Sequence, residues 1–389
     1  MRILHIDTER GWRGGERQVL WLAAELARRG HGSFVAARSG EPLAERAGRT
    51  GLSVVACAPA FEADPRAVLR LRAFIKRERV DIVHAHTAHA VALGALATLS
   101  LSVRPPLVVA RRVDFHLRRN VGTRWKYRRA DAVIAVSRAV AEILVADGVD
   151  RARVTVVPDG TDVHREVRPA ASETLVALGV PRGAPLVVQV AQLVGHKDPL
   201  TFVRAVAAAV KRVPGLHALL VGDGPLREQV EDAIREQRLS DRLHLAGYRT
   251  DADALLAAAD VVALSSREEG MGSVLLDALL IGKPIAATRA GGIPDVIDDG
   301  VTGLLAPVGD PAVLGVRIAT LLEDRVLAAR LAAAARARVA EFSVERMADR
   351  TLAVYERVLG GHVADGRDLA TRRTVAATRA SSTSSMRAP

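Results

Sequence analysis

The stretch SSREEGMGSVLLDALLIGKPIAATRAGG, residues Ser265–Gly292, reads as a strand end, a loop, a helix and a second strand. The residues VVALSS predict a short buried strand that ends near Ser266, and the loop after it contains Gly270 and Gly272. An apolar helix is expected from about Ser273, and PIAAT predicts the next strand. A strand–helix–strand unit of this length is typical of a parallel sheet covered by helices.

The same alternation continues on both sides of this stretch. Short runs of β-branched and apolar residues alternate with segments of helical period, from RILHID at the N-terminus to GLLAP. One interruption, PDGTDVHREVRPAA at residues 158–171, contains no such run. We therefore predict two doubly wound α/β domains that face each other, with the joint near residues 158–172.

The predicted boundaries are residues 1–165 for the N-terminal domain and 172–341 for the C-terminal domain. FSVERMADRTLAVYERVL, residues 342–359, predicts an amphipathic helix with Ser343 as its N-cap. Residues 360–389 are small, polar and basic and offer little to bury, so we predict disorder there.

The composition limits the classes of protein to consider. A chain of 389 residues with 49% hydrophobic residues is long enough for two buried cores. Cys57 is the single cysteine, which excludes an intramolecular disulfide framework and a multi-cysteine zinc site and suits a reducing cytosol. The stretch 82–103 lacks Asp, Glu, Lys and Arg, but it is rich in Ala and contains histidines. We expect it to form a buried strand and helix of a soluble protein.

The net charge of +11 raises the question of an anionic partner. Arginine is spread along the whole chain, so we do not expect nucleic-acid binding. One segment, HLRRNVGTRWKYRRA, is locally basic and contains aromatic residues; it is either a solvated surface or a docking surface for anionic lipid headgroups or a phosphorylated acceptor. Its candidate contact residues are Arg118, Arg119, Arg124, Trp125, Lys126, Arg128 and Arg129.

Three strand-to-helix loops carry residues suited to phosphate binding, because ligands of doubly wound domains bind at the carboxyl ends of the strands. Gly14 and Gly15 precede an amphipathic helix, and such a turn lets backbone N–H groups approach a phosphate. Lys197 lies just before another helix, where a cation is unfavourable unless an anion binds there too. In the third loop, the amides of residues 272–274 are free to hold a diphosphate.

Two carboxylates flank this third loop. Glu269 falls just past the strand, and Asp277 lies within the first two turns of the helix. Carboxylates repel phosphate, but they accept hydrogen bonds well from vicinal hydroxyls such as those of a ribose or a hexose. A phosphate cradle between two hydroxyl-binding acids predicts a nucleotide diphosphate sugar as the ligand.

The residues from Glu269 to Ile297 resemble the signature of the retaining family 4 glycosyltransferases. Further segments in the family's order are GGER, DIVHAH, DAVIAVS, VGDGP, LHLAGYR and DGVTGLL. The resemblance covers almost the whole chain. It implies the GT-B fold, in which two Rossmann-like domains face each other across a cleft, the C-terminal domain holds the donor and the N-terminal domain holds the acceptor.

The resemblance also implies roles for individual residues. Glu269 would contact the donor sugar, Asp277 the ribose hydroxyls and Lys197 the diphosphate, with Glu269 and Lys197 as the catalytic residues. The helix at 342–359 would cross back to the N-terminal domain. The implied donor-binding residues are Gly14, Gly15, Gln192, Lys197, Tyr248, Glu269, Met271, Gly272, Ser273, Val274 and Asp277.

The sequence departs from the family in three places. Asp277 stands where the family has Glu, and Gln192 stands where a basic residue is usual. The family's histidine on the N-terminal side of the cleft has no clear counterpart in VVARRVDFHLRRN. The residues that could fill that space are Arg111, Arg112, Asp114 and His116.

Retention implies that the acceptor attacks from the face that the diphosphate leaves, with the diphosphate itself taking the proton. Lys197 and helix dipoles would stabilise the leaving group, so we expect neither a metal nor a cofactor beside the donor substrate. Asp251 and Asp253 form a D-x-D pattern, but acids at a helix start have a routine explanation. His84 and His86, at the end of a strand, are expected to be structural or to line the cleft.

The sequence thus predicts a hexosyltransferase that uses a nucleotide diphosphate sugar, with a UDP-sugar as the commoner case. The basic segment favours a lipid-linked or cell-envelope glycan at the inner face of the cell membrane as the acceptor, in a cytoplasmic or peripheral membrane protein, and a small soluble acceptor is the alternative. Two alternatives are a nucleotide-sugar 2-epimerase and a non-catalytic sugar-nucleotide-binding protein at a membrane surface. The departures at Gln192 and Asp277 leave the latter alternative open.

Overall fold

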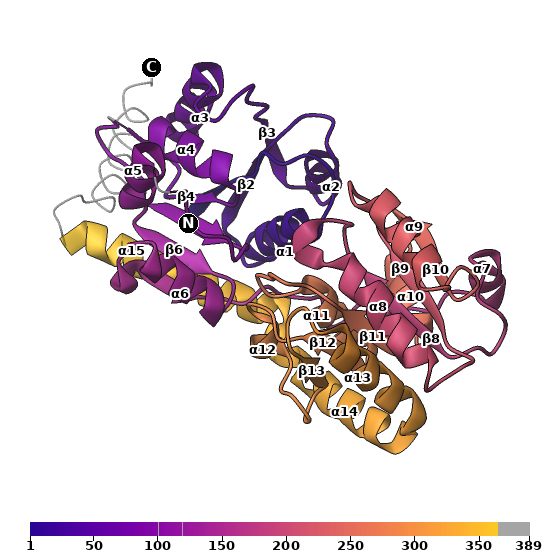
Figure 1. The fold of residues 1–389 in the computed structure, drawn as a ribbon. Helices are drawn as coiled ribbons and strands as arrows, with labels where there is room; N and C mark the ends of the chain where they lie inside the picture. Colours follow the sequence, from indigo (N-terminus) through magenta and orange to yellow (C-terminus); the bar gives the residue numbers. More distant parts are fainter. Residues whose placement is uncertain (100, 119, 365–389) are drawn as a thin grey trace, which may run out of the picture.

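The computed structural model describes residues 1–99, 101–118 and 120–364. Two parallel sheets form the centres of two domains, which lie end to end in Figure 1. Helices cover both faces of each sheet, since every connection between neighbouring parallel strands must cross over the sheet. The predicted architecture of two Rossmann-like doubly wound domains is confirmed.

The first sheet has the strand order β3-β2-β1-β4-β5-β6-β7. Its strands are β1 (Arg2–Ile6), β2 (Gly32–Ala37), β3 (Ser53–Ala56), β4 (Ile82–Ala85), β5 (Leu107–Arg111), β6 (Ala132–Ala135) and β7 (Val154–Val156). The helices of this domain are α1 (Gly14–Arg28), α2 (Pro42–Arg49), α3 (Pro65–Glu78), α4 (Ala88–Ala97), α5 (Val121–Arg129) and α6 (Arg138–Ala146), with a 3-10 turn η1 (Arg151–Arg153).

The second sheet has the strand order β10-β9-β8-β11-β12-β13. Its strands are β8 (Leu186–Val190), β9 (His217–Val221), β10 (Leu243–Gly247), β11 (Val261–Leu264), β12 (Ile285–Thr288) and β13 (Leu304–Ala306). The helices here are α7 (Ser172–Ala177), α8 (Pro199–Val210), α9 (Arg227–Glu236), α10 (Ala252–Ala258), α11 (Ser273–Ile281), α12 (Ile293–Val296), α13 (Pro311–Glu323) and α14 (Arg325–Arg338), with 3-10 turns η2 (Gly195–Lys197) and η3 (Val339–Phe342).

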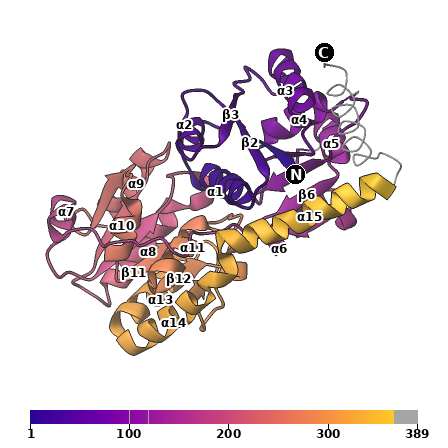
Figure 2. The same ribbon diagram turned by 180° about the vertical axis from the view of Figure 1, so that it is seen from behind.

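The last helix, α15 (Val344–Ala364), leaves the second domain and packs against the first (Figure 2). Its buried residues Met347 and Tyr355 belong to one apolar cluster with Leu22 and Leu26 of α1. The helix continues past residue 359 to residue 364, and residues 365–389, where the sequence predicts disorder, lie outside the described residues. The interior of the first domain is therefore completed by the C-terminal end of the described chain.

The two chain segments that connect the domains lie side by side. Thr161 of the first connection and residues 342–344 of the second exchange two backbone hydrogen bonds, Thr161 N to Phe342 O at 2.7 Å and Val344 N to Thr161 O at 3.1 Å. Gln18 of α1 bonds the backbone of Gly160 through both its amide atoms, at 2.7 and 2.9 Å. These bonds fix the joint relative to the N-terminus of the first helix.

The alanine-rich stretch 82–103 forms β4 and α4. All residues of β4 are buried, and so are most residues of α4, which packs between the sheet and α3. None of the helices in the described ranges is long and apolar enough to cross a membrane.

Candidate active site

The loop between β11 and α11 lies at the carboxyl end of the second sheet and is held rigidly. Ser265, the first residue of the loop, accepts a hydrogen bond at its hydroxyl from Gln189 Nε2 at 3.0 Å, and its backbone N–H donates to Gln189 Oε1 at 3.1 Å. Thr288 donates to the carbonyl of Ser266 at 2.6 Å. Gly272 then takes a φ of +83°, a left-handed conformation that few other residues adopt, and starts α11. The position of Glu269, which lies between Ser266 and Gly272, is therefore well defined.

Glu269 pairs with Lys197 at the base of this loop. The lysine ammonium donates to Glu269 Oε2, which also accepts from the hydroxyl of Ser266 at 3.1 Å. Lys197 ends the turn η2, and Asp198 after it caps α8 from a left-handed conformation. The fold thus brings together the two residues that the sequence marked as catalytic, and the lysine stands where an incoming anion can share its charge.

Asp277 is buried between two arginines from outside its own domain. Its Oδ2 accepts from Arg17 of α1 at 2.8 Å, and its Oδ1 accepts from Arg165 of the connecting segment at 2.8 Å. Arg165 also pairs with Asp253. Burial raises the pKa of Asp277, while the charge and hydrogen bond of Arg17 oppose the rise. The sequence identified the acid but neither arginine, although Arg17 belongs to the GGER segment.

The N-termini of α1 and α11 meet across the interface. A Cβ on Gly14 would lie only 2.5 Å from the hydroxyl oxygen of Ser273, so the absence of a side chain allows the approach. No side-chain hydrogen bond caps α11 at Gly272, whereas Glu16 of α1 accepts from the backbone of Arg13 at 2.8 Å. Two positive helix ends that face each other form a ready site for an anion.

Asp114 reaches the loop from the first domain. Its carboxylate accepts the backbone N–H of Glu269, and a Cβ on Gly291 would lie 2.7 Å from the same carboxylate. The side chains of the other three candidates have other partners. Arg112 bonds Asp159 at 2.9 Å and His86 at 3.1 Å. Arg111 donates to the Phe115 carbonyl at 2.5 Å, and His116 bonds Asp147 at 2.9 Å. Asp114 is therefore the one of the four that contacts Glu269 through its side chain.

Glycine also sets how closely the domains approach. A Cβ on Gly270 would lie 1.9 Å from the carbonyl oxygen of Arg112, and one on Gly292 would lie 2.6 Å from the Cβ of Ser137. Met271, which follows, is buried, and its Sδ accepts the backbone N–H of Asp159 at 3.3 Å. The E-G-M-G sequence therefore serves the domain interface as well as the loop itself.

Both halves of the chain match known sequence families. Residues 12–165 match the family described as Glycosyltransferase Family 4, and residues 172–338 match Glycosyl transferases group 1. The chain belongs to the glycosyltransferases.

Similar proteins support the same assignment. The chain is 33% identical to the 2-deoxystreptamine glucosyltransferase of Streptomyces kanamyceticus over 67% of its own length and 69% of the relative's. It is 27% identical to the lipopolysaccharide core biosynthesis glycosyltransferase LpsE of Rhizobium meliloti, over 73% and 78% of the two chains. The structure of Anabaena HepE in complex with UDP-glucose matches with a TM-score of 0.79 and 25% identity, covering 92% of this chain and all of the other. The fold of this glycosyltransferase is thus GT-B.

Other predicted donor residues of the glycosyltransferase lie around the same edge of the second sheet. Tyr248 directly follows β10 and is 65% exposed. Gln192 follows β8 and is exposed, with no side-chain hydrogen bond among the described residues. A Cβ on Gly15 would meet nothing within 4 Å, so open space lies in front of this residue. Gln192 and Tyr248 thus follow strands of the second sheet, whereas Gly15 belongs to α1 of the first domain.

Asp7 is a cleft residue that the sequence reasoning missed. It follows β1, is buried, and lies near Glu16 of α1. Burial raises the pKa of Asp7 from its ordinary 3.8 to about 7, although the backbone N–H of Glu9 opposes the rise with a 3.0 Å hydrogen bond. An acid directly after the first strand was visible in RILHID, but nothing in the sequence indicated its burial.

Three buried histidines lie beneath the cleft of the glycosyltransferase. Nitrogen atoms of His5, His84 and His86 lie within 4.8 Å of one another, close enough to consider a metal site. Arg112, which can only donate, bonds His86 Nδ1, so His86 must donate through Nε2 to His5 Nδ1 at 3.0 Å. Burial lowers the pKa of all three rings, that of His5 to about 3. The adjacent guanidinium disfavours a further cation, so we interpret the group as structural.

The acids of the D-x-D pattern already have cationic partners. Asp251 bonds Arg249 at 2.6 and 2.7 Å, and Asp253 pairs with Arg165. The two carboxylates therefore serve different arginines, one local and one on the domain connection.

The basic segment of the first domain is less uniform than its sequence indicates. Lys126 is buried and pairs with Glu62, so it is not part of an exposed basic surface. Arg118, Arg124 and Arg128 are exposed, and Trp125 is partly so. Arg129 is half-buried, and Arg119 lies outside the described residues.

Proposed function

We propose that this protein transfers a hexose from a nucleotide diphosphate sugar, a UDP-sugar in the first instance, to a glycan or lipid-linked acceptor with retention of configuration. The observation that carries the proposal is that the N-termini of α1 and α11 meet at Gly14 and Ser273, next to the loop that bears Glu269, the partner of Lys197, and on the helix that bears Asp277. A diphosphate bound at these N-termini would satisfy the free amides and the lysine. The complex of HepE with UDP-glucose supports the choice of nucleotide.

The chain's own groups account for each part of the transfer. Glu269 accepts hydrogen bonds from sugar hydroxyls, and Asp277 accepts them from the ribose. As the acceptor oxygen bonds to the anomeric carbon, the bond from that carbon to the diphosphate breaks, and the acceptor proton passes to the departing phosphate oxygen. Lys197 and the amides of α11 stabilise the charge that develops there, which requires no metal.

Exposed arginines of the first domain favour an anionic acceptor over an amine. Arg118, Arg124 and Arg128 are exposed on the first domain, and like charges oppose a polyamine such as the 2-deoxystreptamine named for one relative. The lipopolysaccharide core named for another relative fits the basic surface better. We therefore propose action on a cell-envelope glycan or its lipid-linked precursor at the cytoplasmic face of the membrane.

The test is UDP release from UDP-glucose, UDP-galactose and UDP-N-acetylglucosamine, with and without phosphorylated glycan acceptors and with EDTA present. Lys197→Ala is expected to lower kcat by about 100-fold or more, since it removes the charge that stabilises the leaving group. Arg330→Gln, an exposed change on α14, is the control and should behave as wild type. Proton NMR of the product reports whether the anomeric configuration is retained.

The outcomes separate the alternatives. A sugar altered at C2 without transfer indicates an epimerase, and nucleotide binding without turnover on any acceptor indicates a non-catalytic binding protein. Loss of turnover with EDTA would contradict metal independence. Equal rates for Lys197→Ala and wild type would contradict the whole assignment of the site.

A further inference from the structure

A cavity of about 540 Å³ lies in the first domain. It lies between α4, α5 and the loop before α3, and its size is that of an ordinary ligand pocket. Its walls are mainly small or apolar side chains. The lining residues used below are Ala92, Leu96, Arg118, Gly122, Trp125 and Lys126.

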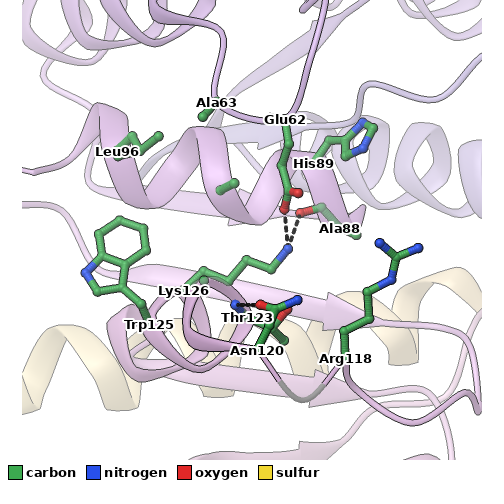
Figure 3. Close-up of a pocket in the computed structure, with 12 residues that line it drawn as sticks. Glu62, Ala63, Ala88, His89, Leu96, Arg118, Asn120, Thr123, Trp125 and Lys126 are labelled. Carbon is green, nitrogen blue, oxygen red and sulfur yellow. Dashed lines mark hydrogen bonds and ion pairs between the residues drawn. The ribbon is translucent and has the colours of Figure 1, made fainter.

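The two ends of the cavity differ in chemistry. In Figure 3, Trp125 and Leu96 lie at one side, and Arg118 lies at the other with His89 above it. Lys126 between them is already neutralised by Glu62 and also donates to the carbonyl of Ala88 at 3.3 Å. The cationic end thus depends on Arg118, which has no carboxylate partner in the described part of the chain.

Two exposed apolar side chains are sequence neighbours of lining residues. Val121, at the start of α5, is 84% exposed, and Phe61, next to Glu62, is 59% exposed. Trp125, which lines the cavity, is itself partly exposed. Exposed large apolar side chains favour an interaction with an apolar ligand over a purely solvated surface.

The cationic end is connected to the donor site by one loop. Arg118 follows Asp114 by four residues, and Asp114 accepts the backbone N–H of Glu269. Four residues span at most about 14 Å when extended, so Arg118 lies within that range of Asp114. Trp125 lies on the side of the cavity opposite Arg118 (Figure 3).

We propose that this cavity binds the phosphorylated lipid carrier of the acceptor, with a phosphate at Arg118 and the first part of the alkyl chain against Leu96, Ala92 and Trp125. Such a molecule carries matching groups in sequence: a sugar hydroxyl for the donor, a phosphate for Arg118, and an alkyl chain for the apolar side of the cavity. This inference rests on the proposed transferase function and specifies its acceptor.

The experiment measures binding of dodecyl phosphate by isothermal titration calorimetry, below its micelle concentration, with dodecyl maltoside and inorganic phosphate as comparison ligands. Wild type should bind dodecyl phosphate more tightly than either, because each of the others supplies only one of the two interactions. Arg118→Gln should lower the affinity for dodecyl phosphate by about 10- to 100-fold, the change expected from loss of a hydrogen bond to a charged group. Arg330→Gln, equally exposed but on α14, should leave the affinity unchanged.

Two substitutions fill the cavity by different routes. Ala92→Leu adds volume from the buried face of α4, and Gly122→Leu adds it from α5, where a Cβ meets only the Asn120 side chain at 3.5 Å. Gly122→Leu also improves helix propensity, so it is the variant expected to remain folded. Both should abolish dodecyl phosphate binding while UDP binding is retained.

The results distinguish binding of a lipid phosphate in the cavity from docking of the protein surface to a membrane. Equal binding of dodecyl phosphate and dodecyl maltoside, or unchanged binding in Gly122→Leu, overturns the proposal. Vesicles of phosphatidylglycerol that bind wild type and Gly122→Leu equally, with no dodecyl phosphate binding, would show a membrane-docking surface in its place. Failure to bind UDP contradicts the transferase function itself and is read separately from these titrations.

Discussion

Asp277→Asn tests the cross-domain network at the donor site. The substitution preserves the shape of the side chain but replaces one carboxylate oxygen by an NH₂ group. Both oxygens of Asp277 accept from guanidinium groups at 2.8 Å, and its side chain is only 5% exposed. The new NH₂ group would therefore face the donor of either Arg17 or Arg165.

The expected loss of stability follows from this geometry. Removing one partner from a buried ion pair costs about 3–5 kcal/mol. Arg17 and Arg165 retain 18% and 24% exposure of their side chains, so water can reach them and the lower value applies. About 3 kcal/mol corresponds to a fall in Tm of about 6–12 °C for a domain of this size.

The same substitution should weaken the binding of the nucleotide. Because Asp277 is proposed to hold the ribose, loss of its charge should lower the affinity for UDP by about 100-fold. At a UDP concentration of 100 times the wild-type Kd, wild type gains about 2.7 kcal/mol, whereas the variant gains about 0.4 kcal/mol. Thermal unfolding followed by circular dichroism, with and without UDP, measures both quantities.

Asp232→Asn is the matched control, because Asp232 pairs with Arg235 on the exposed face of α9. A surface pair of this kind contributes at most about 0.5 kcal/mol. A Tm of Asp277→Asn within a degree of the control would contradict the network, and an undiminished UDP shift would contradict the ribose role.

Three further outcomes are expected. Asp114→Ala should lower kcat/KM by about 10- to 100-fold, since it removes the acceptor of the Glu269 backbone N–H, and Asp114→Asn should restore part of the activity; steady-state kinetics with UDP-glucose decide this. Gly270→Ala should lower kcat/KM by about 100-fold because its Cβ would lie 1.9 Å from a carbonyl of the opposite domain, whereas Gly48→Ala, an exposed change on α2 whose Cβ would meet nothing within 4 Å, should remain within about two-fold of wild type in the same assay. Since the pKa of Asp7 is raised from 3.8 to about 7, the folded protein holds this proton more tightly, and the resulting stabilisation is full below pH 4 and lost, by about 4 kcal/mol, as the pH rises through 7. Asp7→Asn should therefore match wild type in urea unfolding at pH 4 and exceed it at pH 8; equal free energies of unfolding at both values would contradict this.

The loop between β11 and α11 shows how much of a site can be inferred from residues that are neighbours in the sequence. A short apolar strand, two glycines and an apolar helix follow each other within residues 261–281, so neighbours in sequence are neighbours in space. The carboxyl ends of β8 and β11 meet because these strands pair in the sheet, which brings Lys197 and Glu269 together. Periodicity and the rule for parallel sheets predicted that each residue lies at a strand-to-helix loop, whereas their shared role at the donor was implied by the family resemblance.

The partners of these residues could not be inferred in the same way. Arg17 is 260 residues from Asp277, and Asp114 is 155 residues from Glu269. Their contacts depend on how the two domains approach, which in turn depends on glycines whose missing side chains admit a facing backbone. No pattern along the chain specifies such a distance.

The sequence by itself determined the two doubly wound domains, the loop that bears Glu269 and the glycines that shape it, because these follow from local periodicity and backbone freedom. The tertiary structure alone decided the burial of Asp7, Asp277 and Lys126, and with it the cavity in the first domain. The physical reason is that burial is a property of what packs over a residue, and most of what covers these side chains comes from distant parts of the chain.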